Sequence, residues 1–471
     1  MGMISLADVL VGTGGTRYRL PVATRATEET PDAAEFAQVG IDSRTIGEGD
    51  LFVAVCGETH DGHRFISDAV ARGATGVLVA QGRAAEFAAT GATAIEVDDT
   101  LAALGRLGAY WRAKFTLPIV GITGSVGKSS TKELIAGVLG TKLRVLKSPK
   151  SYNNEYGLPL SVLLIDAATE VAVLEMGTFG PGELAALAAI ARPTIAVVTN
   201  VGHSHLERMG SQDGIARAKG ELVAALPASG VAVLNGDDPR VRAMTTLTVA
   251  RSIVYGYGDG CDLRASELVD HGLDGLSFTL HWQGESRRLD HAPLLGAHSV
   301  YTALAAGATA LAVGFSFAEV VAALGRPHAA VRLLIVPGPR GSTIINDSYN
   351  AAPASALAAL AILAQTPARR RLAVLGDMLE LGAYEEEAHR IVGRRVAEVA
   401  EVLLTIGPRA RIIADEAARC GIAAERIARF ERKDEVIAAL ARDLRPGDSV
   451  LIKGSRGLAL EDVVAALREA E

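Results

Sequence analysis

The feature that most constrains the fold of this chain is an apolar strand that runs into a glycine-rich turn and then into a helix. Ile119 and Val120 precede the turn, and residues 132–139 have helical spacing. Such a turn directs backbone N–H groups and the positive helix end toward phosphate oxygens, while a lysine adds charge and a hydroxyl can hold Mg²⁺. We therefore expect nucleotide phosphates to bind at Thr123, Gly124, Ser125, Val126, Gly127, Lys128, Ser129 and Ser130.

The spacing within this phosphate loop (residues 123–130) differs from the common nucleotide-binding pattern G-x-x-x-x-G-K-[ST]. Ile122 stands where that pattern requires glycine, so the match is to the shorter form Thr-Gly-Ser-x-Gly-Lys-Ser. A glycine turn with an incidental lysine is the alternative interpretation. The strand before the loop and the helix after it favour the phosphate site.

The length, net charge and cysteine content of the chain limit the classes of protein to which it can belong. With 471 residues and 49% hydrophobic content, the chain is larger than one core usually sustains, so several domains are expected. The net charge of -7 predicts no nucleic-acid partner and no polybasic membrane contact. Cys56, Cys261 and Cys420 are too few and too scattered for a disulfide framework, which fits a reducing cytoplasm. No segment resembles an export signal or a membrane span, so we expect a cytoplasmic protein without stable membrane insertion.

Alternating strand-like and helix-like segments predict an α/β protein of three domains. Apolar runs at 51–55 and 75–80, on either side of a helical pattern at 65–72, indicate a small N-terminal α/β domain. An acidic segment ends this domain, and a new helical pattern follows it. We place the first domain at residues 1–98.

The rest of the chain divides into two larger α/β units. Residues 99–331 are expected to form a central domain of the phosphate-loop ATPase type, with a doubly wound and mostly parallel sheet. Within it, residues 261–290 alternate in polarity between glycine turns and predict extra antiparallel strands. After a Gly-Arg-Pro break at 325–327, the alternation resumes and predicts a Rossmann-like domain at residues 332–471.

Polar residues follow two strands of the predicted central sheet. Glu175 comes directly after residues 171–174, and His203 and His205 follow residues 195–199. Ligands of open α/β sheets bind beyond the carboxyl ends of the strands, so we expect Glu175 near the terminal phosphate and its metal. The two histidines also allow two other interpretations, a hydrolase metal pair or loop histidines bonded to backbone.

Further short motifs occur from one end of the chain to the other. They include Ile41-Asp42-Ser43-Arg44, Ser151-Tyr152-Asn153-Asn154-Glu155, Leu174-Glu175-Met176-Gly177, Ala218-Lys219-Gly220-Glu221, Asp347-Ser348-Tyr349-Asn350-Ala351, Gly376-Asp377-Met378-Leu379-Glu380-Leu381-Gly382 and Lys453-Gly454-Ser455-Arg456. With the phosphate loop, these motifs resemble the Mur ligase superfamily. Its members are ATP-dependent enzymes that join an amino acid or a dipeptide to a UDP-linked muramoyl carboxylate.

The last three motifs resemble most specifically the branch of this superfamily that adds D-alanyl-D-alanine. The sister ligase that adds diaminopimelate or lysine usually carries Asp-Asn-Pro-Arg in its C-terminal domain, and that signature is absent from this sequence. Folylpolyglutamate synthase shares the central fold but lacks about a hundred residues ahead of the phosphate loop. The length of the present chain therefore argues against it.

The resemblance implies a reaction and its catalytic groups. The implied substrates are UDP-N-acetylmuramoyl-tripeptide and D-alanyl-D-alanine, which would be joined through an acyl phosphate with ATP and Mg²⁺. Lys128, Glu175, His205 and Lys219 would be catalytic, and Ser129, Glu175, His205 and Lys219 would hold metal. In related ligases the lysine that Lys219 matches is carbamylated, although a helical lysine taken alone would usually be solvated.

The resemblance also assigns binding residues in all three domains. Beyond the phosphate loop, ATP would contact His298, Arg332 and Asp347. The UDP-linked substrate and the dipeptide would contact Asp42, Ser43, Arg44, Asn153, Asn154, Asn350, Lys453 and Arg456. Asn350 has an alternative role as the N-cap of a helix that begins near Pro353.

Two departures and two competing functions accompany the resemblance. Ser299 and Thr302 stand where the family usually has asparagine, and Val331 stands where a glycine usually precedes the arginine. The competing functions are another amino-acid-adding Mur ligase and a non-catalytic nucleotide-binding switch. We expect a monomer whose domains close about linkers near residues 98 and 331.

Overall fold

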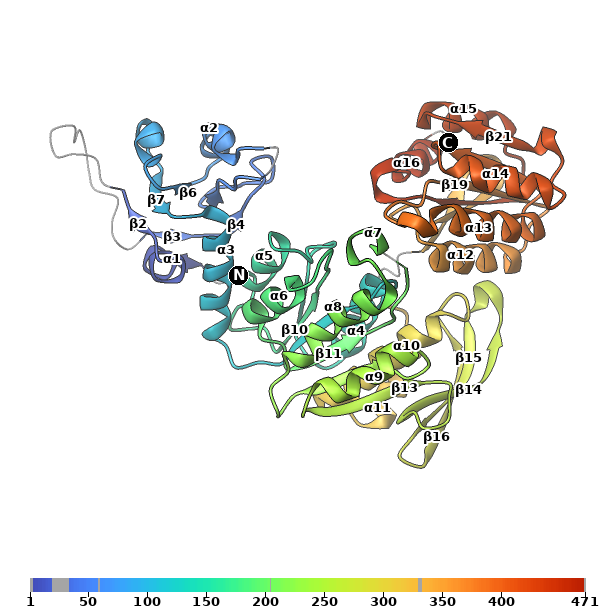
Figure 1. The fold of residues 1–471 in the computed structure, drawn as a ribbon, viewed down its shortest axis with the longest axis horizontal. Coiled ribbons are helices and arrows are strands. Elements are labelled where there is room, and N and C mark those ends of the chain that lie inside the picture. Colours follow the sequence, from blue (N-terminus) through green and yellow to red (C-terminus); the bar gives the residue numbers. More distant parts are fainter. Residues whose placement is uncertain (1–2, 19–33, 58–59, 204, 329–332, 470–471) are drawn as a thin grey trace.

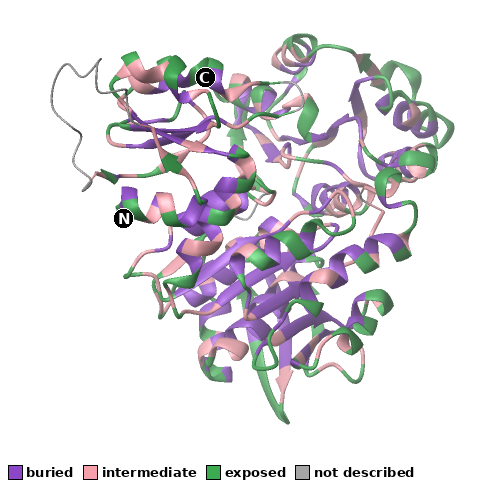
Figure 2. Cartoon of the chain, turned by 60° about the vertical axis from the view of Figure 1, so that its left-hand side comes forward, coloured by how far each residue is buried: buried purple, intermediate pink, exposed green. Residues whose placement is uncertain are grey.

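The structure is a computed structural model that describes residues 3–18, 34–57, 60–203, 205–328 and 333–469. Three α/β units follow one another along the chain, with the first and last at opposite ends of the molecule and the second between them (Figure 1). Buried residues concentrate in the strands and on the helix faces that cover them (Figure 2). This is the three-domain α/β architecture that the sequence predicts. In the described part of the chain, no helix is long and apolar enough to cross a membrane.

The N-terminal unit is a small sheet with helices beside it. The sheet order is β2-β7-β6-β5-β4, and β1 pairs separately with β3. The elements are β1 (Ile4–Ser5), α1 (Leu6–Thr13), β2 (Thr16–Arg17), β3 (Glu35–Phe36), β4 (Val39–Gly40), β5 (Leu51–Val53), α2 (Ile66–Ala71), β6 (Gly76–Ala80), β7 (Thr93–Val97) and α3 (Thr100–Ala113). The Asp99 carboxylate caps α3 by accepting from the N–H groups of Leu101 and Ala102, an arrangement typically worth about 1 kcal/mol.

The central unit is a doubly wound sheet with the order β16-β15-β14-β13-β12-β11-β8-β10-β9. Strand β8 lies in its middle and is buried at every position, as expected for a parallel strand covered on both faces. Its strands are β8 (Ile119–Thr123), β9 (Val145–Lys147), β10 (Val171–Glu175), β11 (Ile195–Val198), β12 (Val231–Asn235), β13 (Arg251–Gly256), β14 (Leu263–Asp270), β15 (Leu276–Trp282) and β16 (Glu285–Ala292). Strands β8 to β14 run parallel. The predicted antiparallel extension is formed by β15 and β16, which continue the sheet from β14.

Helices cover both faces of the central sheet. The core on one face includes α4 and α10 with α11, and the core on the other includes α5, α6 and α8. The helices are α4 (Lys128–Leu139), α5 (Gly157–Leu163), α6 (Glu183–Ala191), α7 (Leu206–Met209), α8 (Gln212–Ala224), α9 (Pro239–Ala243), α10 (Ser299–Val313) and α11 (Phe317–Leu324). The carboxyl ends of β8, β10 and β11 therefore meet at one edge between the two helix layers.

The C-terminal unit has the sheet order β17-β18-β22-β19-β20-β21, parallel except for β17. Helices α12, α13 and α14 cover one face, and α15 and α16 cover the other. The elements are β17 (Leu334–Gly338), β18 (Ser342–Asn346), α12 (Pro353–Gln365), β19 (Arg370–Gly376), α13 (Glu385–Val399), β20 (Val402–Ile406), α14 (Ala410–Arg419), β21 (Ile427–Phe430), α15 (Lys433–Asp443), β22 (Asp448–Lys453) and α16 (Glu461–Glu469). The Rossmann-like prediction is confirmed.

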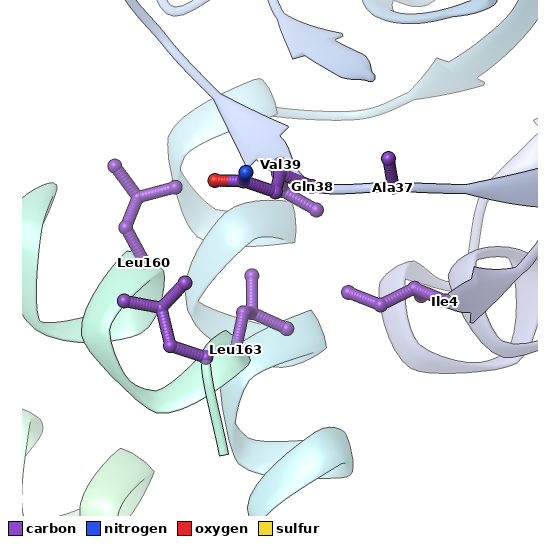
Figure 3. Close-up of a pocket in the computed structure, with 7 residues that line it drawn as sticks. Ile4, Ala37, Gln38, Val39, Leu160 and Leu163 are labelled. Carbon is purple, nitrogen blue, oxygen red and sulfur yellow. The ribbon is translucent and has the colours of Figure 1, made fainter. Parts of the chain in front are cut away.

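Helix α3 joins the N-terminal unit to the central one. Its apolar face belongs to the N-terminal core, and that core also includes Leu160 and Leu163 of α5. A small cavity at this seam is lined by α5 side chains and by residues of the N-terminal unit such as Ile4 and Val39 (Figure 3). The Trp111 indole N–H also donates to the Ile165 carbonyl at 2.9 Å. The first two units are thus continuously packed.

Candidate functional site

The phosphate loop lies at the carboxyl end of the central strand of the sheet, between β8 and α4. Gly124 has φ 149° and Gly127 has φ 87°, and both values favour glycine. At Gly124 the constraint is doubled, because a β-carbon there would lie 1.8 Å from the Thr199 hydroxyl. The glycines predicted from the sequence are therefore required by the turn itself.

Lys128 opens α4, and its ammonium group folds back over the loop. Its Nζ donates to the Gly124 carbonyl at 2.7 Å. No side chain caps α4, and the first N–H groups of any helix lack partners within that helix. The helix start therefore combines a cation with backbone donors, the arrangement that anions favour.

Glu175 is held against the phosphate loop at the end of β10. The Ser129 hydroxyl donates to its Oε2 at 2.5 Å, and the Asn153 amide donates to its Oε1 at 2.8 Å. Its own N–H donates to the Ser148 hydroxyl oxygen at 3.1 Å, and the residue is 1% exposed. A buried carboxylate beside a hydroxyl group is a donor set that suits Mg²⁺. The predicted metal ligands Ser129 and Glu175 are thus brought together, with Asn153 beside them.

Lys219 lies on α8 and is 2% exposed. Among the described residues, its ammonium group makes no hydrogen bond or ion pair. Burial, and then the nearby charge of Lys128, lower the pKa of Lys219 well below its ordinary value. The alternative interpretation of Lys219 as a solvated helical lysine is therefore wrong, and burial shifts its ammonium group toward the neutral amine.

His203 and His205 lie in the segment after β11 and meet the C-terminal unit. The His203 ring stacks on Tyr384 at 4.2 Å between centroids, and His205 Nδ1 lies 2.5 Å from Glu380 Oε2. Phe179 packs edge-on against the His205 ring. The contact with His205 keeps the pKa of Glu380 below its ordinary value. The two histidines therefore contact different residues of the C-terminal unit.

The predicted C-terminal residues form one cluster at the ends of β18 and β22. Lys453 is 2% exposed, and its Nζ donates to Asp347 Oδ2 at 2.6 Å and to the Asn350 carbonyl at 2.8 Å. Asn350 Oδ1 accepts from the N–H groups of Ala351 and Arg456. The N-cap of α12 is Ala352, so the alternative role for Asn350 as that N-cap is wrong.

Two hydroxyl groups connect this cluster to the central unit. The Tyr349 hydroxyl donates to the Ser151 hydroxyl oxygen, and the Arg456 guanidinium lies over the Tyr349 ring at 5.1 Å. Ser151 precedes Asn153 and Asn154 in the chain, and Asn154 Oδ1 accepts from the Gly157 N–H at the start of α5. Predicted substrate-binding residues of both units therefore lie next to this contact.

The remaining predicted ATP contacts are partly described. His298 is the N-cap residue of α10, and the adjacent Ser299 donates its hydroxyl to the Leu295 carbonyl at 2.6 Å. Ser299 thus uses its side chain within its own turn. Arg332 lies outside the described residues, as does the linker near residue 331.

The predicted UDP-binding residues lie in the turn after β4. Asp42 and Arg44 form a two-point ion pair, with Arg44 Nη2 2.7 Å from Asp42 Oδ2. Hydrogen bonding to the Arg44 guanidinium lowers the pKa of Asp42 to about 2. Ser43 is buried between them, whereas Arg44 is exposed. The structure does not bring these residues near the phosphate loop, consistent with separate ends of one long substrate.

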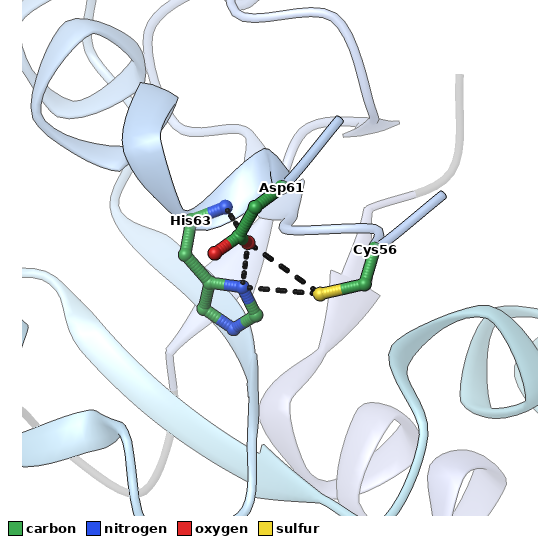
Figure 4. Close-up of side chains that lie close together, drawn as sticks. All are labelled: Cys56, Asp61 and His63. Carbon is green, nitrogen blue, oxygen red and sulfur yellow. Dashed lines mark hydrogen bonds and ion pairs between the residues drawn. The ribbon is translucent and has the colours of Figure 1, made fainter. Parts of the chain in front are cut away.

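Cys56, Asp61 and His63 form a separate cluster in the N-terminal unit (Figure 4). The His63 Nε2 accepts from the Ala80 N–H at 3.0 Å, so the proton of the neutral ring is on Nδ1, which faces Asp61 at 2.7 Å. A protonated nitrogen cannot bind a metal. The cluster is therefore a hydrogen-bonded brace between β6 and the loop after β5.

Sequence reasoning missed several residues that shape the site. Lys132 is 1% exposed and donates to the Ser148 and Lys150 carbonyls, which fixes the segment that carries Ser151 and Asn153. Ser148 holds the Glu175 backbone, and Glu380 contacts His205. Glu380 was contained in a recognised motif, whereas no local pattern distinguishes Lys132 or Ser148.

Comparisons with known proteins match this geometry. Three family models cover the chain in order: Mur ligase family, catalytic domain, at residues 35–112; Mur ligase middle domain at 122–310; and Mur ligase, glutamate ligase domain, at 331–456. A Bacillus subtilis relative, UDP-N-acetylmuramoyl-tripeptide--D-alanyl-D-alanine ligase, is 35% identical over 92% of this chain and 93% of its own length. The chain belongs to the Mur ligase family.

Solved structures agree with this assignment to the Mur ligase family. A crystal structure of MurF from Acinetobacter baumannii matches with a TM-score of 0.84 and 28% identity, covering 100% of this chain and 99% of that one. A Thermotoga maritima MurF ligase in complex with ADP matches with a TM-score of 0.74 and 26% identity, covering 92% and 97%. Mur ligases are ATP-dependent, so the chain is an ATP-dependent ligase.

Proposed function

We propose that this enzyme joins D-alanyl-D-alanine to the peptide carboxylate of UDP-N-acetylmuramoyl-tripeptide, in the cytoplasmic synthesis of peptidoglycan precursors. The observation that carries the choice of substrates is the nearly full-length likeness to a ligase of that name. The geometry supports the chemistry, because the segment that orients Glu175 through Asn153 also contacts the C-terminal unit, where the Ser151 hydroxyl oxygen accepts from Tyr349. Tyr349 lies within the C-terminal cluster of Asp347, Asn350 and Lys453.

The reaction needs a carboxylate to become an electrophile. The terminal carboxylate of the tripeptide attacks the γ-phosphorus of ATP, and ADP leaves, which gives an acyl phosphate. The amine of the dipeptide then attacks the carbonyl carbon, loses a proton, and expels inorganic phosphate as the amide forms. Positioning and charge neutralisation supply most of the rate enhancement in such phosphoryl transfers.

The residues around Glu175 fit a magnesium ion. Ser129 and Glu175 would hold it, and Mg²⁺ when bound neutralises charge on the phosphate oxygens. Lys128 adds a fixed positive charge at the start of α4 and offsets charge that develops on the transferred phosphate. These groups are preorganised, since hydrogen bonds from Asn153 and Ser129 already orient the carboxylate.

Lys219 and His205 would hold a second cation. An ammonium group cannot coordinate a metal, but a carbamylated lysine presents carboxylate-like oxygens. The buried, partner-poor environment and lowered pKa of Lys219 favour the neutral amine that carbamylation requires. We therefore propose that Lys219 is carbamylated.

Each of the three units would bind different parts of the substrates. Residues 1–98, with Asp42, Ser43 and Arg44, would bind the UDP end of the substrate. Residues 99–331 would bind ATP through residues 123–130 and His298, and residues 332–471 would contribute Arg332 and Asp347 to ATP. Asn153 and Asn154 with Asn350, Lys453 and Arg456 would contact the peptide and dipeptide, in a monomeric enzyme.

Product analysis tests this proposal. The enzyme incubated with ATP, Mg²⁺, UDP-N-acetylmuramoyl-tripeptide and D-alanyl-D-alanine should yield a nucleotide whose mass has increased by the dipeptide less one water. Glu175→Gln should abolish that product. A product that contains a single amino acid would indicate another amino-acid-adding Mur ligase, and ATP binding without any product would indicate a nucleotide-binding switch.

A further inference from the structure

The segment that follows β11, residues 199–202, is hydrogen-bonded to the phosphate loop. The Ser125 N–H donates to the Asn200 carbonyl at 3.0 Å, and the Thr199 hydroxyl donates to the Val126 carbonyl at 2.7 Å. The Gly202 N–H donates to the Ser125 hydroxyl oxygen at 2.8 Å. The loop therefore does not rest on its own turn geometry alone but on a second segment of the chain.

Within this contact, one side chain holds both backbone groups of a single loop residue. Asn200 Oδ1 accepts from the Val126 N–H at 3.0 Å, and Asn200 Nδ2 donates to the Val126 carbonyl at 2.9 Å. A flipped amide would place donor against donor and acceptor against acceptor, so the orientation of Asn200 is determined. We propose that Asn200 is a positioning residue, which fixes the phosphate loop in the shape that binds the β- and γ-phosphates of ATP.

The two hydrogen bonds between the Asn200 side chain and Val126, here called the clamp, determine which groups of the loop can face phosphate. The N–H groups of Ser125 and Val126 both point to Asn200, one to its backbone and one to its side chain. Phosphate is therefore met by the groups beyond them, from Gly127 into the first turn of α4. Without the clamp, the Val126 peptide can rotate, and Gly127 and the start of α4 lose their fixed direction.

Asn200 is itself anchored to the next strand of the sheet. The Asn235 amide donates to the Thr199 carbonyl at 2.9 Å, and the Asp238 carboxylate accepts from the Val201 N–H at 2.7 Å. Asn235 is the last residue of β12, and Asp238 follows that strand. Asn200 thus transmits the fixed position of two strand ends to the phosphate loop, which a surface asparagine could not do.

Nucleotide binding to the full-length chain tests this inference, which rests only on the ATP-binding part of the proposed function. The Kd values of ADP and AMP are measured by calorimetry with Mg²⁺ for the native chain, Asn200→Ala and Asn200→Asp. Asn200→Asp keeps the size and the acceptor but loses the donor, so it decides the question if Asn200→Ala does not fold. Asp213→Asn, an amide-for-carboxylate exchange at an exposed position of α8, is the matched control.

The result expected is that both Asn200 variants bind ADP about tenfold more weakly or worse. Asn200→Ala loses both hydrogen bonds to Val126, and Asn200→Asp loses one and places a carboxylate oxygen against the Val126 carbonyl. AMP should lose no more than about twofold, because it lacks the phosphates that the loop orients. Native ADP affinity in either folded variant would overturn the inference, as would equal losses for ADP and AMP. A failure to use D-alanyl-D-alanine would not affect these binding values, so the two proposals can fail separately.

Discussion

His205 Nδ1 lies 2.5 Å from Glu380 Oε2, although the two residues belong to different units of the chain. Both have left-handed backbone conformations, with φ 61° at His205 and φ 64° at Glu380, which are costly for residues other than glycine. The loop that carries Glu380 is held at several points. The Asp377 carboxylate accepts from the Ala410 N–H, and the Met378 N–H donates to His389 Nε2. The C-terminal unit therefore presents Glu380 rigidly to a predicted metal ligand.

Replacing Glu380 by glutamine should lower the rate of phosphate release about tenfold or more, because partners that orient metal-binding histidines typically contribute that much. The neutral amide keeps the size of the side chain but removes the charge that faces His205. Steady-state assays with saturating substrates give the rate. Glu387→Gln, an exposed position of α13 paired with Arg394, is the control and should keep the native rate. Equal rates for the two variants would exclude a role for Glu380.

In protein freed of bicarbonate, so that Lys219 is unmodified, replacing Lys219 by methionine should stabilise the fold, and the variant should be inactive in the ligase reaction. The buried lysine is unfavourable, because its folded pKa lies below the ordinary value of 10.5 and unfolding therefore takes up a proton. The penalty grows as the pH falls from 10.5 toward the folded pKa, so native stability should rise with pH over that window. Methionine should remove this dependence and raise the thermal midpoint, by about 2–4 °C per kcal/mol gained. Unchanged or lower stability at neutral pH would contradict this account of Lys219.

Carbamylation of Lys219 is tested by mass. Protein kept in bicarbonate and analysed under native, non-acidic conditions should show a population heavier by one carbon dioxide. Lys219→Met should lack that population, and Lys142→Met, which changes an exposed lysine on the same unit, should retain it. A single unmodified mass in bicarbonate would contradict the modification.

The sequence allowed much of the fold and part of the site to be predicted, and the reason differs from residue to residue. The phosphate loop and Glu175 depend on local order, a strand followed by a turn or an acid, so their positions follow once the sheet is parallel. The positions of the residues that hold those groups in place do not follow from local order. Lys132, Ser148 and Asn200 act through loops that meet only in the folded chain, and Glu380 meets His205 only where two units touch. Burial of Lys219 likewise depends on how α8 packs.

Domain closure should be visible in solution scattering. Because the N-terminal core contains both the apolar face of α3 and Leu160 and Leu163 of α5 in the central unit, movement at residue 98 would expose apolar surface. We therefore expect the C-terminal unit to move most, about the linker near residue 331. The radius of gyration should fall when an ATP analogue and the UDP-linked tripeptide are added together. No compaction with both ligands would contradict closure as part of the cycle.

Phosphate release tests the central claim most directly. The enzyme is supplied with ATP, Mg²⁺ and UDP-N-acetylmuramoyl-tripeptide, and inorganic phosphate is followed after addition of D-alanyl-D-alanine, D-alanine, lysine or diaminopimelate. The account predicts sustained release, one phosphate for each amide formed, only with the dipeptide. Release with a free amino acid instead, or none with D-alanyl-D-alanine, would contradict it.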